Sequence, residues 1–129
     1  MVIPFINYML VGENIQISKL NQIIARFRQN EGADIYALGN CSEFAVCLKR
    51  FVGGGTITKS GLAHTTLQYK NHYCDIYGCK KQSFGEYTRP ARPSENAHIQ
   101  RYLENGKNGK LPTTQKIMKG LRKAQQEVR

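Results

Sequence analysis

Apolar residues recur at the spacing of an amphipathic helix in two stretches of the first half of the chain. The first set is Ile17, Leu20, Ile24 and Phe27. It predicts a helix over 17–29, with Gly32 just past its end. The second set is Phe44, Ala45, Leu48, Phe51 and Val52. It predicts a helix that begins at Cys41, is capped near Asn40 and ends at the glycine run 53–55.

After residue 55 the pattern changes to the alternation that is typical of β-strands. Over 63–70 one face holds Ala63, Thr65, Leu67 and Tyr69, and the other holds His64, Thr66 and Gln68. Short β-rich runs flank this stretch at 56–58 and 72–77. Because the runs are joined by short connections, we expect antiparallel strands.

The turn between the second and third of these runs decides which side chains meet. A two-residue turn at Lys70–Asn71 places Thr66 opposite Asp75 and His64 opposite Tyr77. His64 and Asp75 then share a face as diagonal neighbours. A three-residue turn would instead send Asp75 to the opposite face from His64, because side chains alternate along a strand.

The chain changes character again near residue 89. Residues 89–93 contain two prolines and predict an extended linker, followed by a helix from Ser94 to about Asn105. A final helix over 114–128 groups Ile117, Leu121 and Ala124 on one side. We therefore expect one α+β core over 1–88, with helices packed on a small antiparallel sheet, and a Pro-containing linker with a basic helical arm over 89–129.

Length and charge fit this division. The 129 residues are 40% hydrophobic, enough for the core of one domain, and the net charge is +10. Residues 107–129 hold seven of the nineteen Lys and Arg and one acidic residue, so six of the ten net charges lie there. One face of the last helix holds Lys116, Lys119, Arg122 and Lys123. This face is either simply solvated or binds nucleic acid or an acidic protein.

Targeting and metal signals are weak. The first eleven residues are apolar but lack a positive leader and are too short to span a bilayer, so we expect a cytoplasmic protein with no membrane partner. Free thiols are then the default for Cys41, Cys47, Cys74 and Cys79; a Cys74–Cys79 disulfide is conceivable, but a reducing compartment does not support it. Their spacings miss the two-residue knuckle of zinc sites, so no metal or other cofactor is expected.

Three residues suggest a nucleophilic site. Cys41 stands at a predicted helix start, where the positive end of the helix dipole favours the thiolate. His64 could take the thiol proton, and Asp75 could orient the imidazole. The backbone N–H of Cys41 is one candidate oxyanion donor, and Asn40 and Tyr36 are weaker candidates for a second.

The same segments resemble a known family. Asn40-Cys41-Ser42-Glu43-Phe44 resembles the nucleophile motif of NlpC-like and other papain-like thiol hydrolases. His64–Tyr69 and Tyr73–Gly78 resemble their histidine strand and the adjoining strand with the third polar residue. The similarity covers about 36–78 and extends to small papain-like proteins of phages and plasmids. It implies a papain-like arrangement and hydrolysis of a peptide, isopeptide or amide bond in a protein or peptide substrate.

The chain departs from the family pattern at two positions, and two other functions fit the same residues. The NlpC-like pattern has Asp before the cysteine and Gly two positions after it, where this chain has Asn40 and Glu43. One alternative is a catalytically silent papain-like module that binds nucleic acid or an acidic protein through the basic arm. The other is a transglutaminase-like deamidase or acyltransferase that uses the same three residues.

Overall fold

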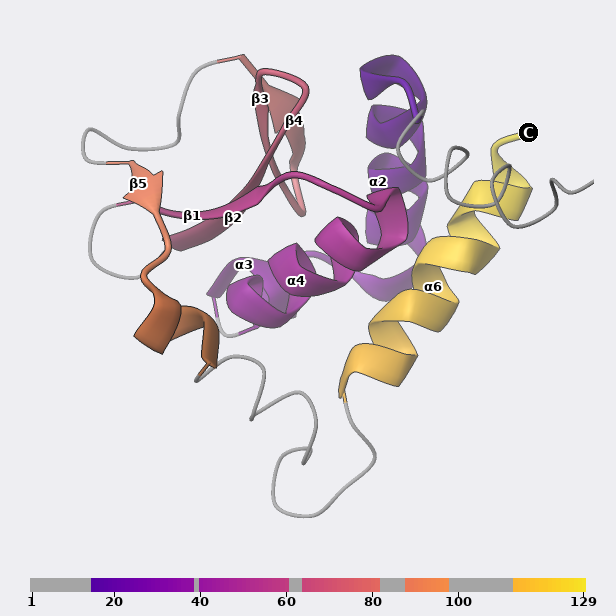
Figure 1. The fold of residues 1–129 in the computed structure, drawn as a ribbon. Coiled ribbons are helices and arrows are strands. Elements are labelled where there is room, and N and C mark those ends of the chain that lie inside the picture. The colour runs from indigo at the N-terminus through magenta and orange to yellow at the C-terminus, as the bar shows by residue number, and fades with distance from the viewer. Residues whose placement is uncertain (1–14, 39, 61–63, 82–87, 98–112) are drawn as a thin grey trace, which may run out of the picture.

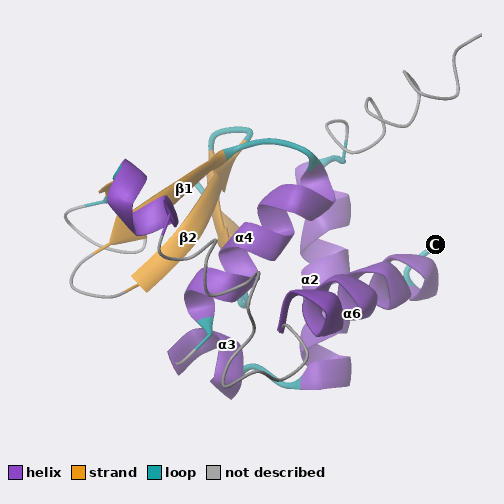
Figure 2. Cartoon of the chain, turned by 60° about the horizontal axis from the view of Figure 1, so that its bottom comes forward, coloured by secondary structure: helices purple, strands orange, loops and turns teal. Residues whose placement is uncertain are grey.

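The fold is an α+β structure in which helices cover one face of an antiparallel sheet (Figures 1 and 2). The structure is a computed structural model that describes residues 15–38, 40–60, 64–81, 88–97 and 113–129. The helices are α2 (Ile17–Glu31), α3 (Asp34–Leu38), α4 (Cys41–Val52) and α6 (Thr113–Glu127). The strands are β1 (Thr56–Ser60), β2 (His64–Tyr69), β3 (His72–Asp75), β4 (Gly78–Lys80) and β5 (Arg89–Pro90). Their order in the sheet is β4-β3-β2-β1-β5.

The first two predicted helices are present as α2 and α4. Helix α2 runs to Glu31 and ends at Gly32, whose φ of 89° lies in the left-handed region that glycine adopts without strain. Helix α4 begins at Cys41 and ends at Gly53, also at positive φ. Aromatic rings join these helices to α3: Phe27, Tyr36 and Phe44 lie with ring centroids 5.2 to 5.6 Å apart.

The β2–β3 hairpin has the register predicted for a two-residue turn. Lys70 and Asn71 form the turn at φ of 49° and 62°, and Leu67 pairs with Cys74. The β-rich run over 72–77 is not one strand, however. It ends at Asp75, and a second turn leads into β4, so Tyr77 is exposed in that turn and does not pair with His64.

The two faces of the sheet differ. The face toward the helices holds the apolar side chains Ile57, Leu67, Tyr69 and Cys74, all buried. The other face holds buried polar side chains. The hydroxyl groups of Thr58 and Thr66 are hydrogen-bonded, with their oxygens 2.6 Å apart, and Asp75 lies on the neighbouring strand. Side-chain alternation explains the separation, because paired residues of antiparallel strands share a face.

Two described parts of the segment after residue 88 pack on the core. Strand β5 pairs with β1 at the edge of the sheet. Helix α6 lies against α2 and α4 (Figure 2), and its stripe of Ile117, Leu121 and Ala124 is fully buried. Of the helix predicted from Ser94, residues 93–97 are helical and the rest lies outside the described residues.

Candidate active site

Two of the predicted site residues, His64 and Asp75, are in direct contact. His64 Nε2 lies 3.0 Å from Asp75 Oδ2. The imidazole ring is half-buried, and the carboxylate is only 6% exposed. The other carboxylate oxygen, Oδ1, accepts the backbone N–H of Tyr77 at 2.8 Å. The turn after β3 therefore fixes the carboxylate, and the carboxylate in turn orients the imidazole.

The contact with Asp75 bears on which nitrogen of the His64 ring carries the proton. With Nε2–H assigned as the donor to the carboxylate, the neutral imidazole of His64 keeps its lone pair on Nδ1. The base of any reaction at this site is then Nδ1. Asp75 is the group that selects this tautomer.

Cys41 is the first residue of α4 and is half-buried. The side chain of Asn40, at the N-cap position, makes no capping hydrogen bond to the helix. The backbone N–H groups of the first turn form the positive end of the helix dipole, so they favour a negative charge near Cys41. The predicted position of the cysteine at a helix start is therefore present.

A hydrogen bond that the sequence did not reveal fixes this helix start to the sheet. Ser42 Oγ lies 2.8 Å from Thr65 Oγ1, and Lys59 Nζ donates to the same oxygen at 2.8 Å. Ser42 follows Cys41 and Thr65 follows His64. The start of α4 and the start of β2 are therefore neighbours.

The same contact shows which way His64 faces. Thr65 lies on the face of β2 that meets α4, so His64, the residue before it, lies on the opposite face with Thr66 and Asp75. A thiol on α4 can therefore meet the imidazole only around the end of β2. His64 is the first residue of that strand.

Tyr36, a predicted oxyanion donor, is placed in the core. It is 4% exposed and its ring packs against Phe27 and Phe44. Burial, followed by the charges of Glu31 and Cys47, raises the pKa of its hydroxyl. These neighbours give Tyr36 a packing role.

The other cysteines differ from Cys41 in their surroundings. Cys47 is fully buried in α4, and burial raises the pKa of its thiol to about 12. Cys74 is also fully buried, and a hydrogen bond with Cys79 together with burial raises the pKa of its thiol. Neither has the half-exposed position at a helix start that a nucleophile needs.

The basic face predicted on the last helix lies on the outer side of α6. Lys116, Lys119, Arg122 and Lys123 all lie outside the buried stripe of the helix. Glu127, an acidic residue of the same helix, accepts hydrogen bonds from Asn30 at 2.7 Å and from Arg26 at 3.0 Å, and these contacts lower its pKa. Arg26 of α2 therefore balances the negative charge of Glu127.

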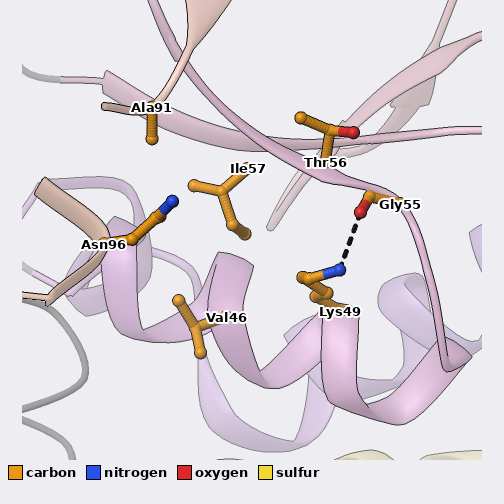
Figure 3. Close-up of a pocket in the computed structure, with 7 residues that line it drawn as sticks. All are labelled: Val46, Lys49, Gly55, Thr56, Ile57, Ala91 and Asn96. Atoms are coloured by element: carbon orange, nitrogen blue, oxygen red, sulfur yellow. Dashed lines mark hydrogen bonds between the residues drawn. The ribbon is translucent and has the colours of Figure 1, made fainter. Parts of the chain in front are cut away.

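A cavity of about 270 Å³ lies between α4, β1 and the segment after β5 (Figure 3). Val46, Ile57 and Ala91 form its apolar wall. The ammonium of Lys49 donates to the carbonyl of Gly55 at 2.7 Å. Cys41, His64 and Asp75 are not among the residues that line this cavity.

Three further findings concern function. Among the described residues, no group of three or more His, Cys, Asp or Glu side chains is placed to hold a metal ion. No helix in the described part of the chain combines the length and hydropathy needed to cross a bilayer. Comparisons with family models, with curated proteins and with solved structures found no match.

Proposed function

We propose that the protein is a cysteine-dependent hydrolase that cleaves a peptide, isopeptide or amide bond through an acyl-enzyme on Cys41. The observation that supports this most is the 3.0 Å contact between His64 and Asp75, with the carboxylate already fixed by the backbone. A histidine oriented in this way is the base that the reaction requires. The proposed arrangement is papain-like, and this chemistry needs no metal or organic cofactor.

In the proposed reaction Nδ1 of His64 takes the thiol proton of Cys41, and the sulfur attacks the carbonyl carbon of the substrate. The backbone N–H of Cys41 donates to the oxygen that becomes negative. When the carbon–nitrogen bond breaks, the leaving amine takes the proton from Nδ1. A water molecule then gives a proton to Nδ1 and attacks the thioester, which releases the acid and restores the thiol.

The geometry sets one requirement for this reaction, because His64 faces away from α4. The Cys41 sulfur and the imidazole must meet at the end of β2, beside the Ser42–Thr65 contact. The variant His64→Cys tests this directly with dibromobimane, a short cross-linker that fluoresces when it joins two thiols. We expect cross-linking of Cys41 to the introduced sulfur, and none in the control variant His72→Cys at the other end of the strand pair. Absence of the cross-link in a folded His64→Cys protein would contradict the triad.

Reactivity is tested by labelling with iodoacetamide near neutral pH and mapping the label by mass spectrometry. We expect Cys41 to react first, and its rate to fall at least tenfold in His64→Ala. Asp75→Asn keeps an oxygen for the Tyr77 N–H but removes the charge, so an intermediate rate is expected. Equal labelling of all four cysteines, or an unchanged Cys41 rate in His64→Ala, would show that the thiol is not activated by this histidine.

The basic face of α6 supports a second candidate function, binding to nucleic acid. The helix buries its apolar stripe, and its outer side is basic. Arg26 and Asn30 donate hydrogen bonds to the carboxylate of Glu127. Clustered Lys and Arg that neutralise phosphates give an affinity that falls steeply with salt. None of the basic residues of this face belongs to the proposed triad, so the two functions are compatible.

The test of nucleic-acid binding uses point variants, because removal of α6 would remove part of the core. We compare Lys116→Gln, Lys119→Gln and Lys123→Gln combined with a control of equal charge change, Arg50→Gln, Lys80→Gln and Lys81→Gln combined. In the α6 variant the slope of log affinity against log salt should fall by roughly one unit for each phosphate that the helix no longer neutralises. The slope of the control should stay that of the native chain. Equal changes in both variants would indicate attraction to the net charge alone.

A further inference from the structure

A pair of cysteines faces each other across the β3–β4 hairpin. Cys74 is the register partner of Cys79, next to the pair Asp75 and Gly78 that closes the turn. Both thiols are free. Because paired residues of antiparallel strands share a face, the two side chains point to the same side of the sheet.

The backbone hydrogen bonds show which kind of pair this is. The N–H of Cys79 donates to the side-chain oxygen of Asn21 on α2, at 2.7 Å, and therefore does not bond across to β3. Cys74 and Cys79 thus form a non-hydrogen-bonded pair, the kind in which Cα atoms lie about 4.5 Å apart and side chains are closest. That spacing falls within the range of about 4.4 to 6.8 Å that disulfides span.

The two thiols differ in access. Cys74 is fully buried, whereas Cys79 is half-buried at the edge strand of the sheet. The hydrogen bond between the two thiols, together with burial, raises the pKa of Cys74. An oxidant from solution therefore reaches Cys79 first, and Cys74 is held beside it.

We propose that Cys74 and Cys79 are a modification site that forms a reversible disulfide with a low-molecular-weight disulfide, such as glutathione disulfide, as the oxidant. The Cys79 thiol loses its proton and attacks one sulfur of glutathione disulfide, which releases one glutathione. Cys74 then loses its proton and attacks the Cys79 sulfur, which releases the second glutathione. The two protein thiols are oxidised and one glutathione disulfide is reduced to two glutathione thiols. This site uses neither Cys41 nor His64.

The experiment equilibrates the full chain in glutathione buffers of rising oxidised fraction, then quenches with acid, alkylates free thiols and digests with trypsin. Peptide 71–80, between Lys70 and Lys80, contains both cysteines. A synthetic peptide of the same sequence is the matched control, because it lacks the fold that holds the sulfurs together. We expect the chain to be half-oxidised at a glutathione disulfide level about tenfold lower than the peptide needs.

Two outcomes would overturn the proposal. One is a folded chain that needs at least as much glutathione disulfide as the free peptide. The other is a glutathione adduct that accumulates on Cys79 and is not displaced by Cys74. The variant Cys74→Ala should accumulate that adduct, and Cys79→Ser should leave Cys74 unmodified. The comparison with the synthetic peptide needs no variant, so it decides the question even if a substitution prevents folding.

Discussion

Gly120, in the middle of α6, gives the sharpest test of how this helix packs. A Cβ atom built at this position would lie 2.6 Å from Phe27 Cε2, closer than real Cβ atoms approach, and 3.1 Å from Cδ2. The ring cannot move aside easily, because Phe27 is fully buried with Tyr36 and Phe44 beside it. Gly120→Ala would gain about 1 kcal/mol from helix propensity and lose about 1 to 3 kcal/mol from overpacking. Because the clash is with a rigid ring, we expect a net loss of about 1 to 2 kcal/mol.

The assay is urea unfolding followed by far-UV circular dichroism, with Gln126→Ala on the exposed side of the same helix as a control. The control should change the free energy of unfolding by no more than about 0.5 kcal/mol. In the background Phe27→Leu, which removes part of the ring, Gly120→Ala should cost less than in the native chain. If Gly120→Ala instead stabilises the protein by about 1 kcal/mol, as at a solvated helix position, the packing of α6 on α2 is refuted.

Three further outcomes follow from single residues. A hydrogen bond from Arg89 lowers the pKa of Glu95 from 4.5 to about 2, so this contact stabilises the fold above pH 4.5 and is lost as the pH falls toward 2. The pH dependence of the melting temperature over that window should therefore be weaker in Glu95→Gln than in the native chain. Cys47, whose pKa is about 12, should react with iodoacetamide only as the chain unfolds, so its labelling rate should rise with urea in step with the circular dichroism. Asn71 lies at φ of 62°, so Asn71→Ala should lower the free energy of unfolding by about 1 kcal/mol, whereas Asn71→Gly should not lower it.

The part of the site that the sequence could predict is the part that depends on strand alternation. Once the turn at Lys70–Asn71 has two residues, the register of β2 and β3 follows, and so does the shared face of His64 and Asp75. The start of α4 at Cys41 follows from the apolar repeat and the glycines after it. These are local rules, and each acts over a few residues.

What the sequence did not predict depends on contacts between distant segments. The Ser42–Thr65 hydrogen bond joins a helix and a strand, and no spacing in the chain indicates it. The turn at Ile76–Tyr77 lies between residues that favour strands, so the β-rich run masked the boundary between β3 and β4. The apolar stripe of α6 could be recognised in the sequence. Its three residues stand among many charges, however, and nothing in the sequence indicated that they pack against α2 and α4.

The packing of α6 also matters for how the protein is made. Arg26 and Glu127, which join α2 to α6, are 101 residues apart in the chain. A ribosome therefore completes α2, α4 and the strands before it delivers the helix that covers them. During that interval the apolar faces of α2 and α4 stay open to other nascent chains. A chaperone that shields such faces would act on this protein until α6 has emerged from the ribosome and packed on them, and a chain truncated before α6 would be prone to aggregate.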